Sequence, residues 1–217
     1  MQPRSIAILG GTGRQGRGLA QRLASAGYRI VVGSRNPTQA AESVRAWRVS
    51  DRVSVATYVD AVARADRVIL ALPFDAIAAT LERLRGTFTR GLVIDVSVPV
   101  VFEAGQAALA RVPEGSAAEH VRARLPPEVA VAAAFKTIPA HVLDEVDRPL
   151  DCDEFVCGDS ADARAAAVEL VEAIAGLRAI DVGPLSRARS IEHLTLLAIG
   201  INRRHKSQDA RFRIVGL

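Results

Sequence analysis

Near its N-terminus the chain reads Ile6-Ala7-Ile8-Leu9-Gly10-Gly11-Thr12-Gly13-Arg14-Gln15-Gly16, an apolar alternation that runs into a cluster of glycines. An alanine- and leucine-rich helical pattern follows at once, over residues 17–26. Gly11, Gly13 and Gly16 therefore have the G-x-G-x-x-G spacing between a predicted strand and a predicted helix. This context indicates a dinucleotide-binding turn, and the alternative is a glycine-rich turn without a ligand.

Each of the three glycines has a steric role in such a turn. We expect Gly11 to allow the tight turn off the strand and Gly13 to let a pyrophosphate approach the backbone. Gly16 should let the helix pack closely on the strand that it has just left. The helix N-terminus offers free N–H groups and partial positive charge to the pyrophosphate.

The end of the next strand is expected to decide which dinucleotide binds. Residues 28–33 are predicted to form a buried strand that leads into Ser34 and Arg35, about twenty residues past the glycines. NAD-specific sites place Asp or Glu here, whereas an arginine suits the 2′-phosphate of NADP. A guanidinium offers that phosphate a bidentate, charge-assisted contact, and Ser34 adds a hydroxyl donor. The pair favours NADP over NAD, with a solvated loop arginine as the alternative.

Apolar runs and helical patterns alternate along the first two thirds of the chain. Further strands are predicted at residues 53–56, 67–72, 92–96 and 129–134, with a polar loop at 102–115. Near-continuous β-branched runs between helices predict an α/β Rossmann fold, a doubly wound parallel sheet with helices on both faces. Two short strands, at 154–157 and 179–182, flank a helix in a small C-terminal α/β appendage. We expect residues 1–145 to bind NADP and residues 146–217 to pack on them and complete the second-substrate pocket.

Composition suits a globular protein that binds small anions. The chain is 49% hydrophobic and 24% charged, and its formal net charge is +4. No basic run is interleaved with aromatic residues, so no nucleic-acid partner is predicted. No apolar run approaches the ~20 residues of a membrane span, and the first strand leaves no room for a signal peptide. We expect a cytoplasmic protein.

The cysteines and histidines do not suggest a metal. Cys152 and Cys157 lie five residues apart in a predicted strand, so their side chains should point to opposite faces. That placement disfavours both a disulfide and shared ligation, and predicts two inert thiols. The four histidines lack H-x-x-x-H or H-x-H spacing, and no metal site is expected.

The last predicted helix, at residues 185–202, carries an apolar stripe. Its members are Ile191, Leu194, Thr195, Leu197, Ala198 and Ile201. Such a stripe is typical of a core or a dimer interface. A basic tail follows, with Arg203, Arg204, His205, Lys206, Arg211 and Arg213. The tail is either a cationic cluster that steers an anionic ligand or a solvated, partly frayed terminus.

Several further motifs lie in order along nearly the whole chain. They are Gly10-Gly11-Thr12-Gly13-x-x-Gly16, Gly33-Ser34-Arg35, Leu72-Pro73-Phe74, Val98-Pro99-Val100, Thr137-Ile138-Pro139-Ala140, Val156-Cys157-Gly158-Asp159, Gly183-Pro184-Leu185, Glu192-His193-Leu194-Thr195-Leu196-Leu197 and Ile201-Asn202-Arg203. By these motifs the sequence resembles the NADPH-dependent reductases of the deazaflavin coenzyme F420.

The resemblance implies an enzyme that transfers a hydride between NADP(H) and coenzyme F420, and a homodimer. It places the phosphates of NADP on the glycine turn and on Ser34 and Arg35, and the nicotinamide at the later strand ends. Together with the glycine motif it gives these cofactor-binding residues: Gly11, Thr12, Gly13, Arg14, Gln15, Gly16, Ser34, Arg35, Gln39, Leu72, Pro73, Phe74, Val98, Val100, Ile138, Pro139 and Ala140. These lie at predicted strand ends, where an open α/β sheet binds its ligand.

Three residues depart from the pattern of the family. Gln39 stands where the family can place a lysine near the 2′-phosphate. Lys136 replaces a histidine or asparagine, and Arg211 replaces a small residue near the deazaflavin. Lys136 is a candidate for stabilising negative charge on the second substrate, with a surface lysine as the alternative. No other catalytic side chain is predicted, because two bound rings carry the reactivity and the protein orients them.

Two other classes of function remain open at the level of sequence. The first is another NADPH-dependent reductase on the same scaffold, acting on imines or, as in ferric-reductase relatives, on flavin. The second is a non-catalytic NADP-sensing module. The apolar residues at the strand ends favour an enzyme, because a sensor has no need for them.

Overall fold

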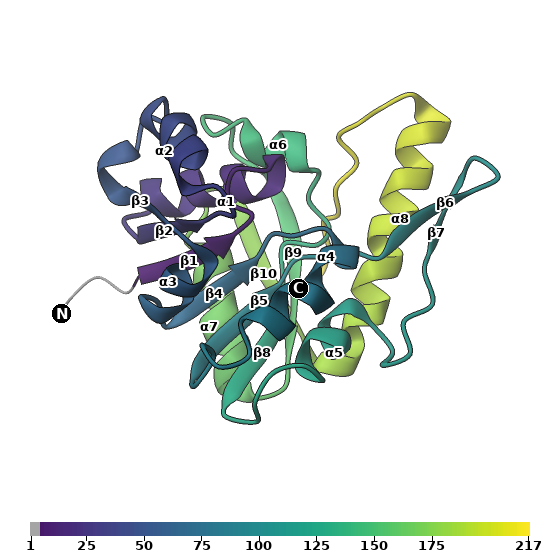
Figure 1. The fold of residues 1–217 in the computed structure, drawn as a ribbon. Coiled ribbons are helices and arrows are strands. Elements are labelled where there is room, and N and C mark those ends of the chain that lie inside the picture. The colour runs from purple at the N-terminus through teal and green to yellow at the C-terminus, as the bar shows by residue number, and fades with distance from the viewer. Residues whose placement is uncertain (1–4) are drawn as a thin grey trace.

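One eight-stranded sheet forms the centre of the molecule (Figure 1). The computed structural model describes residues 5–217, and its strands lie in the order β10-β9-β8-β5-β4-β1-β2-β3. The strands are β1 Ser5–Leu9, β2 Arg29–Gly33, β3 Val53–Ala56, β4 Arg67–Leu70, β5 Gly91–Asp95, β8 Val129–Ala133, β9 Cys152–Gly158 and β10 Leu177–Pro184. Neighbouring strands are parallel except β8 and β9, which are antiparallel. The predicted Rossmann α/β fold is confirmed.

Helices cover both faces of the sheet. One apolar core packs α1 Arg14–Ser25, α2 Pro37–Arg45, α6 Ala140–Asp144 and α7 Ala161–Glu172 on the sheet. The other core packs α3 Tyr58–Ala63, α4 Phe74–Arg83, α5 Ala117–Arg122 and α8 Ala188–His205. Two short 3₁₀ turns, η1 Ser50–Arg52 and η2 Leu185–Arg187, precede β3 and α8. Within residues 5–217 no helix is long and apolar enough to cross a membrane.

The C-terminal strands extend the same sheet. β9 pairs with β8 through Ala132–Gly158 and Ala133–Cys157, and β10 pairs with β9 after the α7 crossover. The sheet is therefore continuous across residue 145, and the proposed division into two parts at that position stays a prediction.

The two cysteines lie on opposite faces of β9. Cys152 packs in the core that contains α1 and α7, and Cys157 packs in the other core. Both thiols are free and buried. Burial raises the pKa of Cys152 to about 11 and that of Cys157 to about 12. Both stay protonated near neutral pH, so the prediction of two separate, unreactive thiols is confirmed.

A β-hairpin replaces part of the loop expected at residues 102–115. β6 Val100–Glu103 and β7 Gln106–Leu109 pair in antiparallel register. Ala104 and Gly105 connect them with φ of 47° and 76°. Positive φ at both positions is the geometry of a tight hairpin turn. The loop prediction was wrong here because alanine at the first turn position is not a hairpin signal.

Helix α1 is held against α6 by close backbone approach and by one buried arginine. A Cβ atom on Gly18 would lie 2.6 Å from the carbonyl carbon of Leu143, so only glycine fits at this crossing. Arg22 donates to the carbonyl oxygens of Val142, Leu143, Glu145 and Arg148 at 2.6–3.1 Å. These bonds satisfy the carbonyl groups at the α6 C-terminus. They hold the end of α6 against α1.

The C-terminal tail is packed between residues 209 and 214. Asp153 donates its backbone N–H to the Phe212 carbonyl at 2.9 Å and accepts from the Ile214 N–H at 2.6 Å. Arg211 donates to the Leu150 carbonyl, and Arg213 pairs with Asp151 at 2.8 Å. The frayed-terminus alternative is wrong for this segment. The predicted cationic cluster does not act as one group, because Arg211 and Arg213 are bound to partners within the protein.

Candidate functional site

In the turn between β1 and α1, the glycines do not all have the roles predicted from the sequence. Gly10 has a φ of 79°, and a Cβ atom there would lie 2.3 Å from the Ala71 carbonyl oxygen. The tight turn is therefore made at Gly10, and the role predicted for Gly11 was wrong. At Gly11 a Cβ atom would lie 3.1 Å from the Ile8 carbonyl oxygen and from Val32. Gly11 provides close packing between strands.

The other two glycines have the predicted geometry. A Cβ atom on Gly16 would lie 2.4 Å from the Gly10 carbonyl oxygen, so glycine is required where α1 leaves the turn. A Cβ atom on Gly13 would meet only that same oxygen, at 3.4 Å, so the backbone there is open. Gly13 is also the N-cap of α1, which has neither a side-chain cap nor an acidic residue in its first turn. The exposed N–H groups and helix dipole suit an anion.

A second polar surface lies at the end of β2. The Ser34 hydroxyl bonds the backbone of Asn36 at 3.1 Å, and the Asn36 side chain accepts from the Gln39 N–H at 3.2 Å. Asn36 thereby caps α2, a role that the Asn-Pro sequence signals. Arg35 is exposed and has no ion-pair partner in the part of the chain that the structure describes. It lies near Tyr58: burial raises the pKa of this tyrosine, and the positive charge of Arg35 lowers it by a smaller amount.

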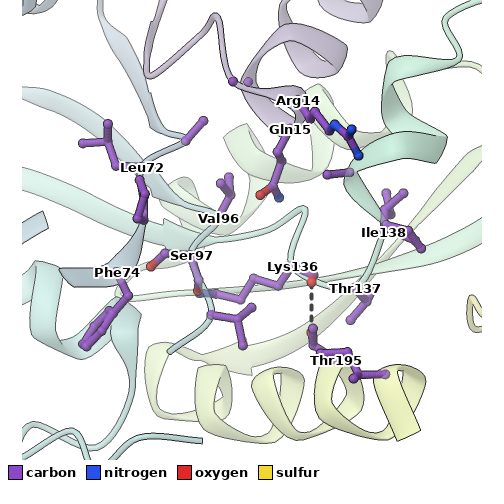
Figure 2. A pocket seen from close by; sticks show the side chains of 18 of the residues that line it. Arg14, Gln15, Leu72, Phe74, Val96, Ser97, Lys136, Thr137, Ile138 and Thr195 are labelled. Atoms are coloured by element: carbon purple, nitrogen blue, oxygen red, sulfur yellow. Dashed lines mark hydrogen bonds between the residues drawn. The ribbon is translucent and has the colours of Figure 1, made fainter. Parts of the chain in front are cut away.

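A cavity of about 520 Å³ opens beside the glycine turn. Its walls come from five places: the turn itself, the ends of β4, β5 and β8, and one face of α8 (Figure 2). Predicted residues that line it are Gly13, Arg14, Gln15, Gly16, Leu72, Pro73, Phe74, Val98, Lys136, Ile138, Pro139 and Ala140. The other predicted residues lie outside it: Gly11 and Thr12 on the turn, Ser34 and Arg35 after β2, and Gln39 on α2. Val100 begins β6 and is also outside the lining.

Sequence reasoning missed several residues of the lining. They are Ala71, Val96, Ser97, Thr137, Thr195, Ala198, Ile199 and Asn202. The last four come from α8, whose stripe was interpreted as a core or an interface. The spacing of Thr195, Ala198 and Asn202 at i, i+3 and i+7 was a signal that one face of this helix meets something other than the sheet.

Four hydrogen bonds hold the turn between β8 and α6. Phe135 has a φ of 57°, and its carbonyl accepts from Gln15 Nε2 at 2.7 Å. The Lys136 carbonyl accepts from Thr195 Oγ1 at 2.9 Å, the bond drawn in Figure 2. On β9, the Glu154 carboxylate accepts from the Lys136 N–H at 3.0 Å and from Thr137 Oγ1 at 2.7 Å. The glycine turn, α8 and β9 therefore all fix this wall of the cavity.

The Lys136 ammonium is buried beneath the cavity. Its Nζ lies 2.6 Å from Asp95 Oδ2, donates to the Ser97 carbonyl and lies 3.7 Å from Glu192 Oε1. The side chain of Lys136 has no exposed surface, so the surface-lysine alternative is wrong. Asp95 also accepts from the Ser97 N–H and hydroxyl, at 3.0 and 2.6 Å. Lys136 thus joins the end of β8 to the end of β5.

Two buried carboxyl groups flank this lysine. Burial raises the pKa of Glu154 to about 7, although hydrogen bonds from Thr137 and Lys136 act to lower it. Burial also raises the pKa of Glu192, against the charge of Lys136 and a bond from the Ala117 N–H at 2.8 Å. Over residues 5–217 no group of three or more His, Cys, Asp or Glu side chains could hold a metal ion.

The arrangement fits a dinucleotide and a second flat ligand. An open backbone, a helix N-terminus and a free arginine are the groups that bind the phosphates of NADP. Apolar walls from Leu72, Pro73, Ile138 and Pro139 suit the faces of planar rings. A site of this kind can orient two rings and exclude water between them.

Comparison with known proteins agrees with this geometry. A crystal structure of a protein from Arthrobacter sp. FB24, provisionally assigned as an F420-dependent NADP reductase, has a TM-score of 0.83 and 26% identity. The match covers 97% of this chain and 98% of that one. Residues 5–99 match the model of the family described as NADP oxidoreductase, coenzyme F420-dependent.

Two curated relatives match over nearly their whole length. The F420-dependent NADP reductase of Methanothermobacter thermautotrophicus is 42% identical, over 98% of this chain and 95% of that protein. The enzyme of the same name from Methanocaldococcus jannaschii is 38% identical, over 98% of each chain. Sequence, fold and cavity therefore lead to one conclusion. The chain belongs to the family of F420-dependent NADP reductases.

Proposed function

We propose that this protein is an enzyme that transfers a hydride between NADP(H) and the deazaflavin coenzyme F420. The observation that carries the proposal is the cavity beside the glycine turn, which has room for two rings face to face against apolar walls. The near-full-length similarity to F420-dependent NADP reductases supports the identity of both ligands.

The residues that would hold NADP(H) lie at two strand ends. The pyrophosphate would lie on the open backbone at Gly13 and on the N-terminus of α1. The 2′-phosphate would lie between Ser34 and Arg35, where a guanidinium can form a bidentate contact. Gln39 is exposed at the start of α2 and offers an amide where a lysine would add a charge.

The remaining walls would orient the two rings. When bound, NADP(H) supplies the hydride or accepts it, and the deazaflavin is the other partner. Pro73 and Leu72 would support the nicotinamide from the end of β4, and Ile138, Pro139 and Ala140 would face the second ring. Such orientation converts an encounter of two molecules into a reaction between fixed groups. We infer that α8 completes the second-substrate half through Thr195 and Asn202.

Lys136 has a positioning role in this proposal. Its ammonium neutralises Asp95 and bonds the Ser97 carbonyl, so it holds two walls of the cavity together. Those contacts occupy the ammonium with partners inside the protein. We therefore assign charge stabilisation on the second substrate to other donors, such as the Thr137 hydroxyl.

The experiment that tests the proposal is a spectroscopic assay. Purified protein is mixed with NADPH and oxidised coenzyme F420, and the visible absorption of the deazaflavin is followed. We expect this absorption to fall only when both the protein and NADPH are present. If NADPH is instead consumed only with an imine or a flavin, the alternative reductases are correct. If no acceptor consumes NADPH, the NADP-sensing alternative is correct.

We also infer a homodimer formed through α8 and the β6–β7 hairpin. These elements form the right-hand side of Figure 1 and expose Phe102, Leu197 and Ile201, with fractional exposures of 73%, 53% and 38%. A groove between them is lined by Phe102, Ala107, Leu196, Ile199 and Gly200, and by the polar side chains of Gln106 and Arg203. A largely apolar surface with polar residues at its edge favours an interface. A cytoplasmic location stays a prediction, and the two unpaired thiols are compatible with it.

A further inference from the structure

We propose that Glu154 and Thr137 form a hydrogen-bond switch for the second substrate, in which Thr137 presents its hydroxyl hydrogen to the cavity when Glu154 carries a proton. The inference rests on the proposed function, because it concerns the half of the cavity assigned to the deazaflavin. Thr137 would touch the substrate. Glu154 acts through Thr137 and is a positioning residue.

Thr137 meets a buried carboxyl group on one side and lines the cavity on the other. Glu154 lies on β9 with no exposed surface, beneath the turn that follows β8. Its Oε2 accepts from Thr137 Oγ1 at 2.7 Å, and its Oε1 accepts from the Lys136 N–H at 3.0 Å. Thr137 is itself part of the cavity lining (Figure 2). The Thr137 hydroxyl therefore has two candidate partners, and it has one hydrogen to donate.

The protonation state of Glu154 decides the direction of this hydrogen bond. An ionised carboxylate only accepts, so it takes the Thr137 hydrogen and leaves a lone pair toward the cavity. A protonated carboxyl group can donate to Thr137 Oγ1 and free the hydroxyl hydrogen. That hydrogen can then be donated to a carbonyl or ring nitrogen at the polar edge of the deazaflavin. The cavity thus meets a donor in one state and an acceptor in the other.

The groups around Glu154 allow it to keep a proton near neutral pH. Burial raises its pKa to about 7, against the hydrogen bonds and the charge of Lys136. The Lys136 ammonium is bound to Asp95 at 2.6 Å and lies 3.7 Å from Glu192. Its charge therefore stabilises those two carboxylates as well as that of Glu154. On the same strand, Cys152 stays neutral because its pKa is raised to about 11. The residue of β10 in register with Glu154 is Ala179, which is uncharged.

Two substitutions separate the role of the Glu154 proton from that of the Thr137 hydroxyl. In Glu154→Gln the amide oxygen still accepts from the Lys136 N–H, and the amide N–H donates to Thr137, as a protonated carboxyl group would at every pH. In Thr137→Val the shape is kept and the hydroxyl is lost. Glu172→Gln, at an exposed position at the end of α7, is the matched control for loss of a carboxylate.

The measurement is calorimetric titration of each protein with oxidised coenzyme F420, from about pH 6 to about pH 8.5. Buffers of different ionisation enthalpy give the number of protons taken up on binding as well as the Kd. Wild type and Glu172→Gln should lose affinity about three- to ten-fold as the pH rises through 7, the equivalent of one neutral hydrogen bond. They should also take up part of a proton on binding at the upper end of this range.

The variants should differ from wild type in opposite ways. Glu154→Gln should keep the tighter binding across the whole pH range, with the proton uptake reduced. Thr137→Val should bind about three- to ten-fold more weakly than wild type at low pH, without the loss through pH 7. NADPH binding provides the folding control, and NADPH affinity should match wild type in both variants.

A pH dependence that persists in Glu154→Gln, or an unchanged affinity in Thr137→Val, would overturn the switch. A wild-type protein that binds NADPH but no coenzyme F420 would overturn the proposed function, and this inference with it. The two failures are therefore distinguishable in one set of titrations.

Discussion

At the scale of single residues, Arg35 carries the expected choice of dinucleotide. It is exposed at the end of β2 beside Ser34, at the position where NAD-specific sites place Asp or Glu. Arg35→Ala should lose a charge-assisted, bidentate contact of about 1.5–3 kcal/mol, or roughly ten- to hundred-fold in NADPH affinity. Fluorescence titration checks this with NADPH and NADH in parallel.

The control for Arg35 is Arg45→Ala, which removes an exposed arginine at the far end of α2. NADH affinity should hardly change in either variant. Equal losses of NADPH and NADH affinity in Arg35→Ala would show that the arginine does not recognise the 2′-phosphate.

Glu154 should also make the stability of the protein depend on pH. Its pKa is about 7 in the folded protein against 4.5 for an unperturbed glutamate. Between these values the folded state holds a proton that the unfolded state has lost, so its contribution to the free energy of unfolding falls as pH rises. The loss is about 3 kcal/mol over this window, complete above pH 7. Glu154→Gln should therefore gain melting temperature relative to wild type from pH 5 to pH 8, and parallel melting curves would contradict the buried proton.

At the scale of elements, the contact between α1 and α6 connects the phosphate-binding helix to the wall of the cavity. Gly18→Ala would bring a Cβ atom to 2.6 Å from the Leu143 carbonyl carbon, so the two helices must move apart. We expect a loss of about 1–3 kcal/mol in the free energy of unfolding, measured by denaturant titration. Gly86→Ala is the control, because a Cβ atom there meets nothing within 4 Å. Equal stability of the two variants would mean that the crossing is not tight.

The elements found from sequence are those with a strong periodic pattern. β1 and α1 follow from the alternation before Gly10 and the helical spacing after Gly16, and β4 and β5 from buried β-branched runs. The five-residue helix α6 was missed because its stability comes from Arg22, which lies over a hundred residues away in sequence. The β6–β7 hairpin was missed because its turn, at Ala104 and Gly105, lacks a recognisable signal.

The candidate site divides in the same way. Residues next to a motif, such as Gly13, Arg14 and Pro139, were predicted because the chemistry is local. Thr195 and Asn202 lie on a helix whose sequence shows an apolar face, and only the fold shows that this face meets the cavity. The partners of Lys136 could not be predicted either, because they come from β5 and α8, which meet only in the folded chain.

At the scale of the whole molecule, α8 is expected to serve two surfaces at once. Ile191 and Ala198 are buried, whereas Leu197 is 53% exposed. Leu197→Asp should place a charge in the proposed interface and dissociate the dimer while the monomer stays folded. Light scattering after gel filtration checks the mass. Val59→Asp on α3, at a residue 50% exposed, is the control and should leave the mass unchanged. A wild-type protein that is already monomeric would contradict the interface.

The central claim is that a hydride passes directly from one ring to the other within the cavity. NADPH carrying deuterium at the transferred position of the nicotinamide is incubated with the protein and oxidised coenzyme F420, and the reduced deazaflavin is analysed by mass spectrometry. The account predicts that the deuterium is recovered on the deazaflavin, because apolar walls exclude water from between the two rings. Reduced deazaflavin without deuterium, or no reduction at all, would contradict it.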